Sequence, residues 1–150
     1  ITENLKHYRE ARGLRIHAYV VMPTHIHLII SADNDLAGLV RDLKKRTSKA
    51  LVAHFTEHRR PPFLNVFRFC GKASRHPVQH QAWEEGSHPE QILSQPFFAQ
   101  KADYIHANPL RKGLVAEPPA WRFSSARQFA GVPLDAGDGG EPVEVDWVEW

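Results

Sequence analysis

The sequence predicts an α+β fold, and three features of its hydrophobic pattern lead to that prediction. A short amphipathic segment at the start is followed by two runs rich in β-branched and aromatic residues, which indicate a pair of antiparallel strands. A long run with helical spacing comes next, and a second helical run lies near the middle of the C-terminal half. With 150 residues and 42% apolar content, the chain is long enough for one compact domain and too short for us to expect two.

The first elements expected are a helix and a β-hairpin. Residues 2–13 carry apolar and aromatic side chains at helical spacing, and the glycine at the end of this range can terminate a helix. Residues 15–22 (RIHAYVVM) and 25–32 (HIHLIISA) have the composition of strands. The Pro23–Thr24 dipeptide between them indicates a tight turn, so the two strands are expected to pair.

The clearest helical pattern runs from residue 36 to about residue 58, where apolar residues recur every three to four positions. Asp33 or Asp35 can cap its N-terminus, and Pro61–Pro62 are expected to stop it. The opposite face of this helix is basic, and it either follows a phosphate backbone or is simply solvated. The basic residues are Arg41, Lys44, Lys45, Arg46 and Lys49.

The remaining elements are less regular. Residues 63–82 show no clean period and are expected to form a loop with a short element, within which residues 78–83 are a candidate strand. A last helix is predicted from residue 96 to residue 106. Residues 131–150 combine four glycines, two prolines and six acidic side chains, which indicates an acidic tail or extended strap after a domain of residues 1–130.

Charge is distributed unevenly along the chain. The first 130 residues hold 19 Lys and Arg against 11 Asp and Glu, whereas the last 20 hold six acidic residues and no Lys or Arg. A basic body suits a phosphate-binding surface, because Lys and Arg displace the counterions condensed on nucleic acid. A mildly basic domain without a nucleic-acid role has the same composition, so the charge alone does not decide the function.

Cys70 is the single cysteine, which excludes an internal disulfide framework. The longest apolar-rich run, residues 19–30, is interrupted by proline, threonine and two histidines and falls short of a membrane span. Because no signal-peptide pattern is visible either, we expect a cytoplasmic protein with no membrane partner. The chain starts at Ile1 without a methionine, so the natural N-terminus could be missing.

Two histidines and a tyrosine are the candidate chemical groups. Period-two alternation places His25 and His27 on one face of the second strand, where both imidazoles can bind one divalent ion. In the last helix, Tyr104 and Asn108 are four residues apart and share a face, just before the break at Pro109. Each feature has an ordinary alternative, since strand histidines are often surface residues and a tyrosine on an amphipathic helix usually packs against the core.

Longer motifs surround these residues. They are AYVVMPTHIHLII at 18–30, WEEGSHP at 83–89, KADYIHANPLRKGLV at 101–115 and WRFSSA at 121–126. In this order and spacing they resemble the single-tyrosine, His-hydrophobe-His transposases of the IS200-like group, and within it the REP-associated tyrosine transposases. The resemblance covers roughly residues 5–130. It is poor at residues 63–80 and at the start, since members of the family usually have a further strand before the first helix.

The resemblance implies a ferredoxin-like α+β domain, in which an antiparallel sheet has helices on one face and the nucleophile's helix crosses the histidine-bearing face. Its first edge strand is missing unless another segment, such as residues 142–148, supplies it. Carried over residue by residue, Tyr104 matches the nucleophile, and His25 and His27 match the metal-binding pair. Asn108 stands where the family places a third metal ligand, an amide.

The resemblance also implies an enzymatic activity. The protein would be a DNA transposase or nickase that cleaves and rejoins single-stranded DNA through a covalent 5′-phosphotyrosine intermediate with a divalent metal. Mg²⁺ or Mn²⁺ is the expected ion, because imidazole, amide, phosphate and water ligands suit hard or intermediate cations, although residue types leave zinc open. The expected partner is single-stranded DNA that contains a hairpin, bound by a monomer or a homodimer.

Basic residues beside the tyrosine helix and on the helix 36–58 are candidates for phosphate contact, and plain surface charge is the alternative for each. The candidate DNA-binding residues are Arg41, Lys44, Lys45, Lys49, Arg111 and Lys112. His88 and His106 are candidates for DNA contact or proton handling, although each also fits a structural or surface histidine.

Two other functions stay open. A non-catalytic nucleic-acid-binding module of ferredoxin-like fold would explain the basic charge, but not the His-x-His pattern combined with Tyr-x-x-x-Asn. A metal-dependent phosphodiesterase that activates water would explain the histidines and would make Tyr104 dispensable. A covalent adduct with single-stranded DNA would separate the transposase from both.

Overall fold

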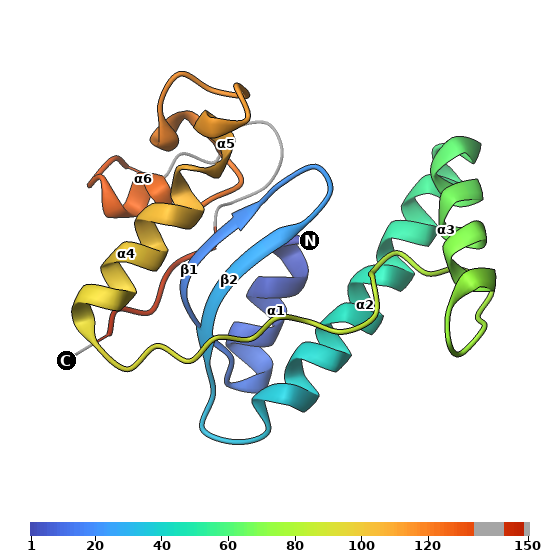
Figure 1. Cartoon of the computed structure of the whole chain (residues 1–150), viewed down its shortest axis with the longest axis horizontal. Helices are drawn as coiled ribbons and strands as arrows, with labels where there is room; N and C mark the ends of the chain where they lie inside the picture. Colours follow the sequence, from blue (N-terminus) through green and yellow to red (C-terminus); the bar gives the residue numbers. More distant parts are fainter. Residues whose placement is uncertain (134–142, 149–150) are drawn as a thin grey trace. The chain divides into compact units, whose positions relative to one another are not determined.

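The computed structural model describes residues 1–133 and 143–148 and has a mixed α+β architecture, as predicted (Figure 1). The chain forms two compact units, residues 1–39 with 91–150 and residues 40–90. Within the described ranges, no helix is both long and apolar enough to cross a membrane. The elements are α1 (Thr2–Arg12), β1 (Arg15–Val21), β2 (Ile26–Ser31), α2 (Leu36–Glu57), α3 (Pro61–Ala73), α4 (Gln95–His106), α5 (Asn108–Arg111), the 3₁₀ turn η1 (Pro118–Ala120) and α6 (Ala126–Phe129).

The first unit contains the predicted hairpin, in which β1 and β2 pair antiparallel. Its turn closes where the N–H of Met22 donates to the carbonyl of His25 at 2.8 Å. The pairing register shifts between Ile16 and Ala18, as at a β-bulge. In the part of the chain that the structure describes, the sheet consists of these two strands.

Both faces of β1 are buried. Ala18 and Val20 form a core cluster with two residues of α4, which runs beside β1 in Figure 1. Tyr19 points to the opposite face, as alternation along a strand requires, and is equally buried. His27 lies opposite Val20 in the sheet and therefore shares the face on which α4 packs.

A segment between η1 and α6 runs along the edge of β1 that β2 leaves open. The N–H of Val21 donates to the carbonyl of Phe123 at 2.8 Å, and the N–H of Ser125 donates to the carbonyl of Tyr19 at 3.0 Å. These bonds belong to the WRFSSA motif. The motif therefore satisfies backbone groups of β1 that an isolated hairpin would leave unpaired.

Part of the predicted C-terminal strap packs on this unit, whereas residues 134–142 lie outside the described residues. In the segment 143–148, two valines are buried, and the N–H of Asp146 donates to the carbonyl of Ile16 at 2.7 Å. The carboxylate of Asp146 also accepts a hydrogen bond from Arg9 of α1 at 2.9 Å. The segment is irregular, so it contacts β1 without forming a strand. The division of the chain into a domain and a separate tail stays a prediction.

Helix α2 has the predicted extent, and Asp35 is its cap. The carboxylate of Asp35 accepts the N–H of Gly38 at 2.9 Å. In the second unit, Thr47 of α2 is buried and accepts a hydrogen bond from the indole of Trp83 at 2.8 Å. The tryptophan of the WEEGSHP motif therefore anchors its loop to α2.

Residues 61–73 form the helix α3, so the loop predicted there is wrong. The two prolines expected to stop the preceding helix lie in the first turn of α3, where a missing N–H costs nothing. The helical period is obscured because apolar side chains occupy most of its circumference. Leu64 faces inward, whereas the exposed apolar residues are Phe63, Val66 and Phe69.

The strand predicted at residues 78–83 is also wrong, because this segment is irregular. It pairs with a helix instead of a strand. The N–H of Val78 donates to the carbonyl of Gly71 at 3.0 Å, and the N–H of Gln81 donates to that of Phe67 at 2.9 Å. A Cβ atom at position 71 would lie 2.4 Å from the carbonyl oxygen of Val78, so this close approach requires glycine.

Candidate active site

His25 directly precedes β2 at the end of the hairpin turn, and His27 is the second residue of that strand. Their ring centroids are 4.9 Å apart and the ring planes are nearly perpendicular, at 85°. Nδ1 of His25 is 3.1 Å from the hydroxyl of Thr24. The turn and the alternation of β2 thus bring two imidazoles together at one end of the hairpin, as the sequence predicts.

Tyr104 comes from α4 and lies beside this pair. Its ring centroid is 6.3 Å from that of His27, with an angle of 83° between the planes. The side chain is 52% exposed, although the neighbouring Ala102 and Ile105 are buried against β1. The buried stripe of α4 therefore fixes the helix on the sheet, and the phenol remains accessible to a large substrate.

Asn108 and Arg111 close the end of α4 around Tyr104. The amide nitrogen of Asn108 donates to the carbonyls of Tyr104 and Ile105, both at 3.3 Å. One guanidinium nitrogen of Arg111 donates to the carbonyl of Tyr104 at 2.6 Å and to the side-chain oxygen of Asn108 at 3.4 Å. Asn108 is 8% exposed. The structure thus groups His25, His27, Tyr104, Asn108 and Arg111 through a chain of contacts.

The electrostatic environment favours the neutral form of His27. Burial lowers the pKa of His27, and coulombic interactions with His25 and Arg111 lower it further. A metal ion binds the neutral ring, so a lowered pKa keeps the ligand available at neutral pH. Two imidazole nitrogens and an amide oxygen are a donor set that fits a divalent cation. Among the described residues, His, Cys, Asp and Glu form no group of three or more that could hold a metal ion.

His106, two residues after the tyrosine, is part of the core. Its Nε2 shares a hydrogen bond of 2.7 Å with the hydroxyl of Ser125, which in turn accepts the N–H of Tyr19 at 2.9 Å. Burial lowers the pKa of His106 to about 4, so the ring is neutral at pH 7. This network joins α4 to β1, which favours the structural alternative for His106. His88 is an exposed residue of the second unit.

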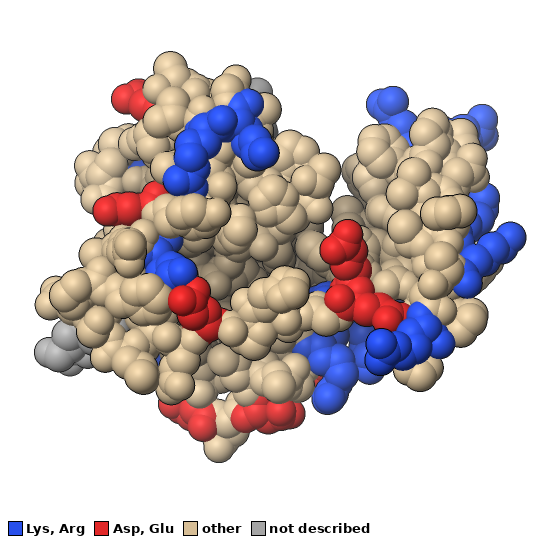
Figure 2. Space-filling model, viewed as in Figure 1, with Lys and Arg blue, Asp and Glu red and all other residues tan. Residues whose placement is uncertain are grey.

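The candidate DNA-binding residues differ in their surroundings. Figure 2 shows Lys and Arg side chains over α5, where Arg111 and Lys112 are exposed. On α2, Arg41, Lys45 and Lys49 are exposed, whereas the ammonium of Lys44 donates to two backbone carbonyls of the WEEGSHP loop, at 2.6 and 3.0 Å. Lys44 therefore holds this loop against α2, a structural role that the sequence did not indicate.

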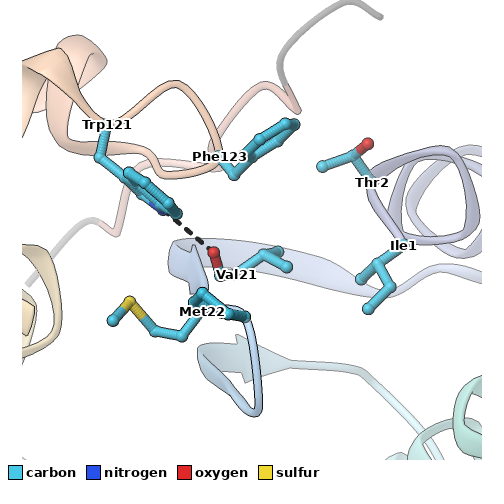
Figure 3. Close-up of a pocket in the computed structure, with 7 residues that line it drawn as sticks. Ile1, Thr2, Val21, Met22, Trp121 and Phe123 are labelled. Atoms are coloured by element: carbon cyan, nitrogen blue, oxygen red, sulfur yellow. Dashed lines mark hydrogen bonds between the residues drawn. The ribbon is translucent and has the colours of Figure 1, made fainter. Parts of the chain in front are cut away.

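An open pocket beside the hairpin turn was not foreseen. It measures about 290 Å³ and is largely apolar. Figure 3 shows the indole of Trp121, which donates to the carbonyl of Val21 at 3.0 Å, and the ring of Phe123 from the same segment, 6.0 Å from that of Trp121. The WRFSSA motif was the available signal, but its residue types do not reveal that it lies along β1. The lining residues are Ile1, Thr2, Val21, Met22, Pro23, Trp121 and Phe123.

Known proteins resemble this chain in sequence and in fold. Residues 1–72, which include the hairpin and its two histidines, match the family described as "Transposase IS200 like". A REP-associated tyrosine transposase of Escherichia coli (strain K12) is 27% identical over 134 residues, which are 85% of this chain. The chain spans 66% of the length of that relative, just under two thirds.

The fold also matches a solved structure. A REP-associated tyrosine transposase bound to a REP hairpin superposes with a TM-score of 0.57, over 95% of this chain and 77% of the other. The two sequences are 22% identical, so this likeness concerns the fold. The chain is accordingly similar to the IS200-like transposases, as the sequence motifs predict. It is similar in sequence to one REP-associated tyrosine transposase and in fold to another structure described by the same name.

Proposed function

We propose that this protein is a metal-dependent DNA nickase and strand transferase with Tyr104 as its nucleophile. The observation that carries the proposal is the position of the exposed Tyr104 ring 6.3 Å from His27, on the sheet face where the two imidazoles lie together. A packing tyrosine would be buried, and isolated surface histidines would not face a helix that presents a phenol. The relation to the transposase family supports the same function.

The chemistry is a transesterification. The phenol oxygen of Tyr104 attacks a DNA phosphorus, an O–P bond forms, and the bond from phosphorus to the 3′ oxygen breaks. The phenol proton leaves to solvent, and the departing 3′ oxygen takes up a proton. The products are a 5′-phosphotyrosine and a free 3′ hydroxyl. The phosphotyrosine ester replaces the DNA phosphodiester with little change in free energy. A 3′ hydroxyl can therefore attack the adduct and rejoin a strand.

His25, His27 and Asn108 are the residues that would hold the metal. When bound, a divalent ion such as Mg²⁺ or Mn²⁺ polarises the phosphate and offsets the negative charge that develops on it. The protein supplies the orientation. His27 is fixed in β2 opposite Val20, and Asn108 is fixed by its two hydrogen bonds to carbonyls at the end of α4.

The proposed substrate is single-stranded DNA that carries a hairpin. The REP-associated tyrosine transposase of similar fold is described as bound to a REP hairpin. In this chain, exposed cations on α2 and next to α5 can contact phosphates, and the exposed position of Tyr104 lets a single strand reach its phenol. Monomeric and dimeric action are both compatible with this substrate.

The test is covalent capture. The purified chain is incubated with Mn²⁺ and a labelled single strand that contains a hairpin, and the products are separated on a denaturing gel. A protein–DNA adduct together with a free 3′ hydroxyl is the expected result. Cleavage without an adduct would favour a phosphodiesterase that uses water. Binding without cleavage, at every metal tried, would favour the non-catalytic nucleic-acid-binding module.

A further inference from the structure

Arg111 makes three contacts around the proposed nucleophile. Its guanidinium carbon lies 4.3 Å from the centroid of the Tyr104 ring. The same side chain donates to the carbonyl of Tyr104 at 2.6 Å and to the side-chain oxygen of Asn108 at 3.4 Å. A flat cation thus covers the Tyr104 ring while its donors are directed into the end of α4.

We propose that Arg111 is a positioning residue that holds the Tyr104 ring against His27, and not primarily a phosphate contact. This inference rests on the proposed function, because it assigns Arg111 to the same reaction. A tyrosine that is 52% exposed would otherwise exchange among staggered rotamers, and the rotamer in the structure places its ring beside His27. The guanidinium restricts the rotamers of Tyr104 by lying over its ring, and its hydrogen bond to the carbonyl of Tyr104 holds the guanidinium in place.

A purely structural role is the main alternative. A cation that hydrogen-bonds the last carbonyls of a helix also stabilises the helix end. The two roles differ in what they change. Loss of a helix cap lowers the free energy of unfolding of the protein. Loss of ring positioning instead lowers the rate of attack by Tyr104 in molecules that are fully folded and saturated with DNA.

The experiment compares Arg111→Met with Arg111→Lys in the full chain. Methionine is an unbranched side chain without charge or hydrogen-bond donors. Lysine keeps the charge, but its ammonium is not planar and cannot donate two parallel hydrogen bonds as a guanidinium does. Lys101→Met is the matched control, because Lys101 lies 4.9 Å from the ring centroid of Phe97 on the same helix and has no proposed contact with substrate. For each variant, we would measure the single-turnover adduct rate at saturating DNA, the DNA dissociation constant and its salt dependence, and the melting temperature.

The expected result is that Arg111→Met lowers the saturated rate by roughly tenfold or more, with DNA affinity and its salt slope unchanged. Arg111→Lys should stay close to Arg111→Met, and Lys101→Met should keep the parent rate. A lowered affinity with a salt slope reduced by about one, and an unchanged saturated rate, would identify a phosphate contact and overturn the proposal. Full recovery of the rate by lysine would overturn it too.

A measurement without DNA separates this proposal from the proposed function. In the folded parent chain, ring protons of Tyr104 and His27 should give a nuclear Overhauser contact, which Arg111→Met should lose and Lys101→Met should keep. If that contact survives in Arg111→Met, the positioning role is wrong even if the parent forms the adduct. If the contact is lost as expected but the parent forms no adduct, the transposase function fails while the positioning of the ring by Arg111 stands.

Discussion

His27 and Tyr104 meet across two elements that are remote in sequence, with ring centroids 6.3 Å apart. His27 is fixed in β2 by its pairing opposite Val20, and Tyr104 is carried on α4, whose buried residues pack on the same strand pair. At this distance the two rings are edge-to-face neighbours, and because Tyr104 is 52% exposed, a substrate can reach its phenol from the solvent side. The rigid parts of the fold therefore define this site, and a loop does not.

Tyr104→Phe should abolish adduct formation while DNA affinity stays within about twofold of the parent. The change removes one hydroxyl and no charge from a half-exposed side chain, so neither the core nor the phosphate contacts are affected. Denaturing gels and fluorescence anisotropy measure the two effects. Cleavage by the phenylalanine variant at the parent rate would rule out the tyrosine mechanism.

His25→Ala and His27→Ala should each remove metal-dependent cleavage, and added Mn²⁺ should not restore it. Two remaining protein ligands hold Mg²⁺ or Mn²⁺ poorly, because these ions bind water strongly. Isothermal titration with Mn²⁺ should show the loss of binding directly. Parent-like Mn²⁺ affinity in both variants would place the metal elsewhere.

Asn108→Ala should reduce cleavage less, with partial rescue at high Mn²⁺, since water can replace a neutral amide oxygen. Asn108 also caps the carbonyls of Tyr104 and Ile105, so a melting curve is the necessary control. A variant that folds normally and cleaves at the parent rate at low Mn²⁺ would refute the assignment of a third ligand.

DNA binding should weaken steeply as the salt concentration rises. For each phosphate contacted on a single strand, the logarithm of the association constant should fall by about 0.7 per tenfold increase in salt concentration. Lys45→Ala and Lys49→Ala should reduce that slope, because both side chains are exposed. Lys44→Ala should lower stability instead, since its ammonium holds two backbone carbonyls. Equal affinity for a blunt duplex and for a strand with a hairpin would contradict the proposed substrate.

Stability should fall as the pH drops below about 6.5, and His106 should account for part of the loss. Its pKa is lowered to about 4 by burial, so between that value and the ordinary 6.5 the unfolded chain binds a proton that the folded chain does not. Protonation therefore favours unfolding in this window, by about 2 kcal/mol between pH 7 and pH 5. In His106→Asn, urea unfolding at the two pH values should show a correspondingly smaller difference. An identical pH dependence in parent and variant would mean that His106 is not neutral in the fold.

Local patterns predicted the elements whose burial is regular. The hairpin, α1, α2 and α4 were foreseen because apolar residues recur at the period of the element, and turn or cap residues mark the ends. The side-by-side placement of His25 and His27 follows from the same alternation along one strand. The motifs added the family, which the comparisons support.

Contacts between distant segments could not be obtained in this way. Helix α3 was missed because its apolar residues also cover an exposed face, so its burial has no visible period. Ser125 bonds to Tyr19, 106 residues away, and Lys44 bonds to Glu84, 40 residues away. Arg111, beyond the end of α4, bonds to the carbonyl of Tyr104, seven residues away. The sequence around a polar side chain does not indicate which group it will bond to. Local sequence thus determined which residues can act as ligands or as a nucleophile, and which helices and strands carry them. The packing of α4 on β1 decided that Tyr104 faces His27, because burial of two apolar surfaces fixes a geometry that neither segment contains alone.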